Sequence, residues 1–269
     1  MISELKTFTR KMIAGANVAT IIVMLLVGFS DWVNPATHPM LALVGLTFPL
    51  ILVINFGFLI FWLIFCKRMA IIPFMGFIMA YAPVRTYIPF NMPHETPIGA
   101  IKVMSYNVHG FNGRGSERDP QASEDIIAFF RKTKPDILCL QEDCGNTQKQ
   151  IQEKMDSIFP HNERAIFGED YDRTGISIYT RFPIIKKEII RYESKGNGSC
   201  AFFLNINGKT VVVVNNHFES NCLTADDKSK YKALLKGDIE GDSAKTDSRY
   251  IAGKLAEASR KRAPQADAV

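Results

Sequence analysis

Long uncharged stretches near the amino terminus constrain this chain more than any other feature of its sequence. Residues 12–30 form a run of 19 residues without a charge, and residues 41–66 form a second run of 26. A helix of about 20 apolar residues is long enough to cross the hydrocarbon core of a bilayer. Both runs are therefore predicted to be transmembrane helices, and the lipid bilayer is the first partner that the sequence indicates.

A third apolar segment, residues 69–83, is shorter and is interrupted by Pro73. We interpret it as a third span completed by flanking residues, with a re-entrant hairpin as the alternative. A cleavable signal peptide is disfavoured, because further apolar segments follow the first run. Residues 1–90 are thus expected to form a multi-pass anchor in the plasma (inner) membrane.

Basic residues set the expected orientation of this anchor. Three of them precede the first span and the pair Lys67 and Arg68 follows the second, whereas residues 31–40 contain no Lys or Arg. Because positively charged flanks stay in the cytoplasm, we expect the amino terminus inside. With three spans, the rest of the chain emerges on the outer face.

The positive charge of the chain is concentrated in the same segment. Up to Phe90 there are six basic and two acidic residues, which leaves 26 basic and 25 acidic of the 32 and 27 in the whole chain. The part after Phe90 therefore carries a formal net charge of only +1. Sequence-blind DNA binding depends on a strongly basic surface, so the overall charge does not favour it.

The sequence changes character after residue 90. Residues 91–99 are rich in proline and are expected to form a short stiff linker, because proline fits neither a regular helix nor a central strand. From residue 100 onward, short apolar runs alternate with amphipathic stretches, which is typical of α/β and α+β folds. One domain is expected over residues 100–269.

Six of the apolar runs have the length of strands, at 101–107, 136–141, 175–180, 184–191, 200–206 and 210–215. Asn207 and Gly208 join the last two, and this dipeptide predicts a hairpin with a type I′ turn. An antiparallel hairpin excludes a purely parallel sheet. Helices are expected from about Asp119, from about Thr147 to Phe159, and over 226–236 and 246–262.

The five cysteines show no evident disulfide framework. Cys139 is interpreted as a small buried strand residue. A metal site formed by Cys139 and Cys144 is the weaker alternative, because no CxxC spacing or paired histidine supports it.

Three of the expected strands become polar at their carboxyl ends. The first ends in Asn107, the second is followed by Glu142, and the last leads into Asn215, Asn216 and His217. Strands that are apolar at both odd and even positions are covered on both faces, so functional groups are exposed at their ends. Each residue alone is more typical of a turn, a cap or a solvated loop, but together they predict a shared site.

Carboxylate and amide oxygens are the ligands that a hard cation prefers. Glu142 and Asn107 are therefore candidates for an Mg²⁺ (or Mn²⁺) site that a phosphate oxygen and water complete. His217 would then face the phosphate, where it can donate a proton or a hydrogen bond to the charge of the transition state.

Four segments, MSYNVHGF, DILCLQED, GISIYTRFPI and VVNNHFES, occur in the order typical of one known family. With them the chain resembles the endonuclease/exonuclease/phosphatase superfamily over about residues 101–269. The resemblance implies an α+β fold, a two-sheet β-sandwich flanked by helices, here preceded by the transmembrane segment. It also implies that Asn107 and Glu142 bind a divalent metal, that His217 contacts or protonates the scissile phosphate, and that Asn215 helps to shape the pocket.

The sequence departs from the family pattern after His217. Family members carry a G-D-x-N segment and an S-D-H segment, which supply the base that activates water and a second histidine, and neither segment occurs here. We therefore expect a domain that is cut short at its carboxyl end, with little or no turnover if the chain is complete.

Two functions follow from these features. The first is a membrane-tethered, metal-dependent hydrolase of phosphate esters, of phosphodiesterase, nuclease or phosphatase type, acting on a nucleic acid, a lipid head group or a sugar phosphate. The second is an inactive membrane protein whose truncated domain serves as a binding module or is the product of an interrupted gene. A transporter is set aside, because no charged residue lies inside the two long spans. The sequence indicates no protein partner.

Overall fold

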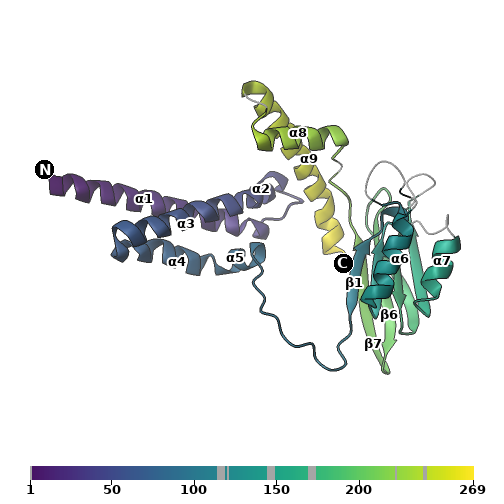
Figure 1. The fold of residues 1–269 in the computed structure, drawn as a ribbon. Coiled ribbons are helices and arrows are strands. Elements are labelled where there is room, and N and C mark those ends of the chain that lie inside the picture. Colours follow the sequence, from purple (N-terminus) through teal and green to yellow (C-terminus); the bar gives the residue numbers. More distant parts are fainter. Residues whose placement is uncertain are drawn as a thin grey trace. The chain divides into compact units, whose positions relative to one another are not determined.

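The computed structural model describes residues 2–113, 119, 121–143, 149–168, 174–221, 223–238 and 241–269. The chain divides into two compact units, Figure 1. The first comprises Met1–His94 and Asn221–Ala263, and the second comprises Glu95–Ser220 and Pro264–Val269. Each unit has its own hydrophobic core.

The first unit begins with the predicted membrane helices. They are α1 (Ile2–Gly28), α2 (Pro39–Val44), α3 (Phe48–Phe65), α4 (Ile71–Met79) and α5 (Tyr81–Tyr87), with the 3₁₀ turns η1 (Ser30–Trp32), η2 (Gly45–Thr47) and η3 (Lys67–Ala70). Two helical stretches, Ser3–Trp32 and Pro39–Phe65, are long and apolar enough to cross a membrane. The third predicted segment is two helices, Lys67–Met79 and Tyr81–Tyr87, bent by 66° at the break between them. This bend suits either a broken third span or a re-entrant loop.

Buried polar side chains join α1 to α3. Asn17 accepts a hydrogen bond from Trp62 Nε1 at 3.1 Å and donates to Asn55 Oδ1 at 3.4 Å. Thr20 Oγ1 donates to the same Asn55 oxygen at 3.1 Å, and both asparagines are fully buried. In an apolar medium such bonds stabilise helix pairs by about 0.6 kcal/mol each.

The first unit also contains α8 (Ala225–Lys236) and most of α9 (Gly241–Asp267). Thr224 and Asp227 form a capping box at the start of α8, with hydrogen bonds of 3.2 and 2.8 Å. Asp227 also contacts Lys254 of α9 at 2.6 Å. The two predicted carboxyl-terminal helices are therefore present, and the second begins five residues earlier than predicted, at Gly241 instead of 246.

The second unit is a two-sheet sandwich, as predicted. The first sheet has the order β1 (Val103–Asn107), β2 (Ile137–Gln141), β4 (Thr174–Thr180) and β3 (His161–Phe167). The second has the order β5 (Ile184–Ile190), β6 (Gly198–Ile206) and β7 (Lys209–His217). β1 and β2 are parallel, and every other pair is antiparallel. Asn207 and Gly208 have φ values of 54° and 80°, as the predicted type I′ turn between β6 and β7 requires.

β2 is buried on both faces, which explains its continuous apolar run. Leu138 and Leu140 pack with residues of α6 (Ala122–Thr133) and α7 (Lys149–Asp156). Ile137 and Cys139 pack on the other side with β6 residues that include Phe202. Helices α6 and α7 thus cover one face of the first sheet and the second sheet covers the other (Figure 1).

Other parts of the second unit also differ in detail from the prediction. The helix expected from about Asp119 begins at Ala122. The start predicted near Thr147 lies outside the described residues, as does Cys144, and α7 ends at Asp156. The strand β3 was not predicted. Residues 91–99 contain neither helix nor strand.

Candidate active site

β1 and β2 bring the first two predicted site residues together. The strands are parallel and Asn107 lies opposite Gln141, so the residue after Gln141 is next to Asn107. The Asn107 amide donates to Glu142 Oε1 at 2.8 Å, and Asn107 Oδ1 accepts from the backbone N–H of His109 at 2.9 Å. The two side chains therefore share one corner at the carboxyl end of the first sheet.

His217 reaches the same carboxylate from the second sheet. Its Nε2 lies 3.4 Å from Glu142 Oε1. The hydrogen bond from His217, assisted by that from Asn107, lowers the pKa of Glu142 to about 2, although partial burial opposes this shift. Glu142 is thus an anion at neutral pH, and the three residues predicted to converge lie in one cluster.

The backbone of Glu142 has a left-handed conformation, with a φ of 55°. This is uncommon for a residue with a side chain. The turn is fixed by hydrogen bonds on both sides, from Gly110 N to Glu142 O and from Asp143 N to Gly175 O, each of 2.9 Å. A Cβ atom on Gly175 would lie 2.4 Å from Asp143 O, so a glycine is required there.

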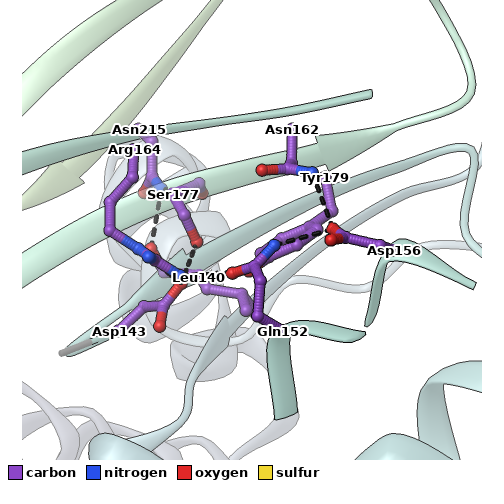
Figure 2. A network of polar contacts seen from close by, with 9 residues as sticks. All are labelled: Leu140, Asp143, Gln152, Asp156, Asn162, Arg164, Ser177, Tyr179 and Asn215. Carbon is purple, nitrogen blue, oxygen red and sulfur yellow. Dashed lines mark hydrogen bonds and ion pairs between the residues drawn. The ribbon is translucent and has the colours of Figure 1, made fainter. Parts of the chain in front are cut away.

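Asp143 anchors this turn through a buried ion pair, drawn in Figure 2. Its carboxylate accepts hydrogen bonds from Arg164 Nε and Nη2 at 3.2 and 2.9 Å and from Ser177 Oγ at 2.6 Å. Arg164 also donates to Gln152 Oε1 at 3.2 Å. Because these partners come from α7, β3 and β4, the network fixes the position of Glu142 relative to the first sheet.

Asn215 lies behind the site and bridges the two sheets. It is 2% exposed, its Oδ1 accepts from Gln141 Nε2 at 2.7 Å, and its amide donates to Leu140 O and Ser177 O, both at 2.9 Å. Side chains two residues apart point to the same face of a strand. Asn215 therefore fixes the position of the strand end that carries His217, but it does not itself line the pocket.

Two buried polar atoms beside the site have no hydrogen-bond partner among the residues that the structure describes. They are His217 Nδ1 and Asn216 Oδ1. A buried polar atom without a partner costs about 1–3 kcal/mol. A polar partner at either atom would therefore stabilise this end of β7.

An open pocket of about 370 Å³ contains the Glu142 carboxylate and the His217 ring. Its lining consists of His109, Gly110, Asn112, Glu142, Thr174, Asn197, His217 and Ser220. Five polar members of this set were not predicted, namely His109, Asn112, Thr174, Asn197 and Ser220. His109 lies two residues after Asn107 in the same segment, and its Nδ1 donates to Gly113 O at 2.9 Å.

The donor set at this corner fits a weakly held hard cation. Glu142 supplies an anionic carboxylate and Asn107 an amide oxygen. Mg²⁺ is commonly held by one or two carboxylates, with water and substrate phosphate oxygens as its other ligands. Among the described residues, no three His, Cys, Asp or Glu side chains are grouped as metal ligands. Other groups, such as water and substrate phosphate oxygens, would therefore have to complete the coordination that Asn107 and Glu142 begin.

Two family models match this chain, one over residues 10–87 and one over residues 104–253. The model of the endonuclease/exonuclease/phosphatase family matches residues 104–253, which is more than half of the sequence. The chain belongs to this family. Its members generally use divalent metal ions. A second model, described only as a domain of unknown function (DUF8431), matches residues 10–87.

Solved structures that match this chain do so at low sequence identity and with low TM-scores. The endonuclease/exonuclease/phosphatase from Beutenbergia cavernae DSM 12333 is 17% identical with a TM-score of 0.39, covering 50% of this chain and 43% of its own. The family protein from Leptotrichia buccalis C-1013-b is 14% identical with a TM-score of 0.37, covering 53% and 64%. TDP2 from D. rerio, complexed with single strand DNA product, is 16% identical with a TM-score of 0.35, covering 52% and 56%.

The chain spans about half the length of the solved structures it matches. Comparison with curated proteins gives no significant match.

Proposed function

We propose that this chain is a membrane-anchored hydrolase of phosphate esters that depends on Mg²⁺ or Mn²⁺. The observation that carries the proposal is the double contact of Glu142, at 2.8 Å with Asn107 and at 3.4 Å with His217. The Glu142 carboxylate thus contacts both the Asn107 amide at the edge of the first sheet and the His217 imidazole on the second sheet. This combination suits a cation and a phosphate placed side by side.

Each residue of the cluster has a separate part in the proposed reaction. Asn107 and Glu142 would hold the cation, which would supply positive charge to stabilise the phosphoryl transition state. His217 Nε2 contacts a non-bridging oxygen or the leaving oxygen of the ester and donates a hydrogen bond or a proton there. Asn215 acts as a positioning residue, because its three hydrogen bonds hold β7 against β2 and β4.

The anchor is proposed to span the membrane three times. The amino terminus would be cytoplasmic and the second unit on the outer face, because Lys67 and Arg68 follow the second span and residues 31–40 have no basic residue. An alkaline phosphatase fused after Gly99 should be active, while a green fluorescent protein fused there after Sec export should be dark. Bright fluorescence and no phosphatase activity at this position would contradict the third span.

The proposed substrate is a phosphate ester of a nucleic acid, a lipid head group or a sugar. The relative from D. rerio was crystallised with a single strand DNA product, and another, ANGEL2, is titled a 2',3'-cyclic phosphatase. Among the described residues of this chain, the pocket lining has one acid, Glu142, and two histidines, His109 and His217. That lining accepts a phosphate without selecting the group attached to it.

The test uses the full chain purified in detergent. Turnover of phosphodiesters and phosphomonoesters is measured with Mg²⁺, with Mn²⁺ and with a chelator. Glu142→Gln keeps the size of the side chain but removes its charge, and it should lower metal-dependent turnover by about 100-fold or more. Glu188→Gln is the matched control, because Glu188 is an exposed acid on β5 that pairs with Lys186 at 2.5 Å. Turnover that survives both the chelator and Glu142→Gln would contradict the proposal.

Binding of phosphate esters without turnover is the second candidate. It is favoured by the single acid in the described lining of the pocket, because Glu142 cannot both hold a cation and accept a proton from water. In that case Mn²⁺ binding, followed by electron paramagnetic resonance, should weaken in Glu142→Gln although no ester is hydrolysed.

A further inference from the structure

A second pocket, of about 480 Å³, lies at the opposite end of the first sheet. It is formed by the turn from α6 to β2, the turn from α7 to β3 and the residue after β4. Arg131, Lys134 and Arg181 supply three cations to its lining, against the single carboxylate of Asp136. Phe159 is among the apolar residues of the lining and is buried.

The one carboxylate of this pocket is already engaged. Asp136 accepts from the backbone N–H of Lys102 at 2.7 Å and contacts Arg181 Nη1 at 2.9 Å. Arg131 is directed by a 3.5 Å contact between its Nη2 and Ser157 Oγ. With Asp136 balanced by Arg181, the charges of Arg131 and Lys134 give the pocket a positive excess. Guanidinium and ammonium groups arranged in this way favour a phosphate.

The chain ties this pocket to the membrane anchor. Lys102 directly precedes β1, and its backbone N–H contacts Asp136. Its Nζ donates to Thr133 O at 2.8 Å. Tyr87 ends the last helix of the anchor, 15 residues before Lys102. Even when fully extended, 15 residues span at most about 54 Å. The basic pocket is therefore always within that reach of the end of the anchor.

We propose that this pocket binds the phosphate headgroup of an anionic phospholipid in the membrane that carries the chain. The cations contact the phosphate oxygens, and the apolar side of the pocket accommodates the glycerol carbons. Asn107 and Glu142 lie at the carboxyl ends of the same strands, roughly 17 Å away for five residues of strand. A domain bound in this way holds the candidate active site away from the lipid surface. The inference rests on the proposed membrane anchor but not on the proposed hydrolase activity.

The test places the full chain in nanodiscs of phosphatidylcholine, with or without phosphatidylglycerol. Hydrogen exchange is measured by mass spectrometry for peptides that cover 131–136 and 157–159. Phosphatidylglycerol should slow exchange in these peptides by about 30-fold, as expected from two lipid-facing cations, and high salt should reverse the effect. The double variant Arg131→Gln with Lys134→Gln should exchange at the rate seen in phosphatidylcholine alone.

Lys195→Gln with Lys209→Gln is the matched control, since both lysines are exposed in the second unit and lie outside the pocket lining. This control should keep the protection. Two further arms add inorganic phosphate or a short single-stranded DNA to discs of phosphatidylcholine. Protection by either of these without protection by phosphatidylglycerol would overturn the proposal, as would loss of protection in the control. Unchanged exchange in β2 verifies that each variant is folded.

Discussion

The buried ion pair between Asp143 and Arg164 should be a main source of stability for the turn that carries Glu142. Asp143→Leu removes the carboxylate while keeping similar volume, and it leaves Arg164, whose side chain is 21% exposed, without its charged partner. Removal of one member of a buried pair costs about 3–5 kcal/mol. Because Arg164 retains some contact with water, the lower end, about 3 kcal/mol, is expected. This corresponds to roughly 150-fold in an opening equilibrium.

The assay has to report on the second unit alone. The two tryptophans, Trp32 and Trp62, both lie in the anchor, so tryptophan fluorescence does not follow the sandwich. Hydrogen exchange of β2 and β4 amides in the full chain does, and Asp143→Leu should accelerate it by roughly 150-fold. The double variant with Arg164→Met should recover most of the loss, because an apolar pair of similar volume often replaces a buried ion pair at little cost.

Asp156→Leu is the control for this prediction. Asp156 is exposed and accepts hydrogen bonds from Gln152 and Asn162 at 2.7 and 2.9 Å in the same network (Figure 2). Its replacement should cost only about 1 kcal/mol, or roughly fivefold in exchange. If the effects of Asp143→Leu and Arg164→Met simply add in the double variant, the two charges are not coupled and the reasoning is refuted.

Three further predictions concern packing, the anchor and thiol chemistry. Gly175→Ala should destabilise the second unit by about 1–3 kcal/mol in the same exchange assay, because the added Cβ would meet a backbone oxygen at 2.4 Å; unchanged exchange would contradict the close approach. Asn55→Leu should lower the thermal stability of the anchor by about 1 kcal/mol, followed by Trp62 fluorescence in detergent; an unchanged or raised melting temperature would contradict a stabilising role. Burial raises the pKa of the Cys139 and Cys200 thiols to about 11. At pH 8 a smaller fraction of these thiols is therefore ionised in the folded chain than in the unfolded chain. Alkylation of both cysteines at pH 8 should be about 100-fold slower in the folded chain than in urea. Equal rates would contradict this.

Part of the candidate site was accessible from the sequence because strand ends carry a strong local signal. β2 is apolar at every position up to Gln141, and a glutamate directly after such a run stands out. Asn107 ends β1 in the same way. In the structure β1 and β2 are parallel neighbours, so their carboxyl ends meet at one edge and bring Asn107 and Glu142 into contact. The roles of these residues in metal and phosphate binding stay predictions.

Other parts of the structure left no such signal. β3 reads HNERAIF, and its polar residues break the alternation that predicts strands. The structure explains the break, because Arg164 of β3 pairs with the buried Asp143. Asn197 and Ser220 reach the pocket from loops, where no periodicity relates a position in sequence to a place in space. The boundaries of α6 and α9 differ from prediction because helix ends depend on local caps and contacts.

The bridge made by Asn215 has a consequence for how ligands act on this protein. One wall of the candidate site belongs to β1 and β2 and the facing wall to β7, so the pocket exists only while the two sheets are docked. A small anion that contacts both His217 and the residues around Glu142 therefore binds the assembled sandwich and not the separated sheets. By mass action, such a ligand stabilises the docked arrangement of the two sheets. The rise in the melting temperature of the second unit then measures ligand occupancy, even if the ligand is not hydrolysed.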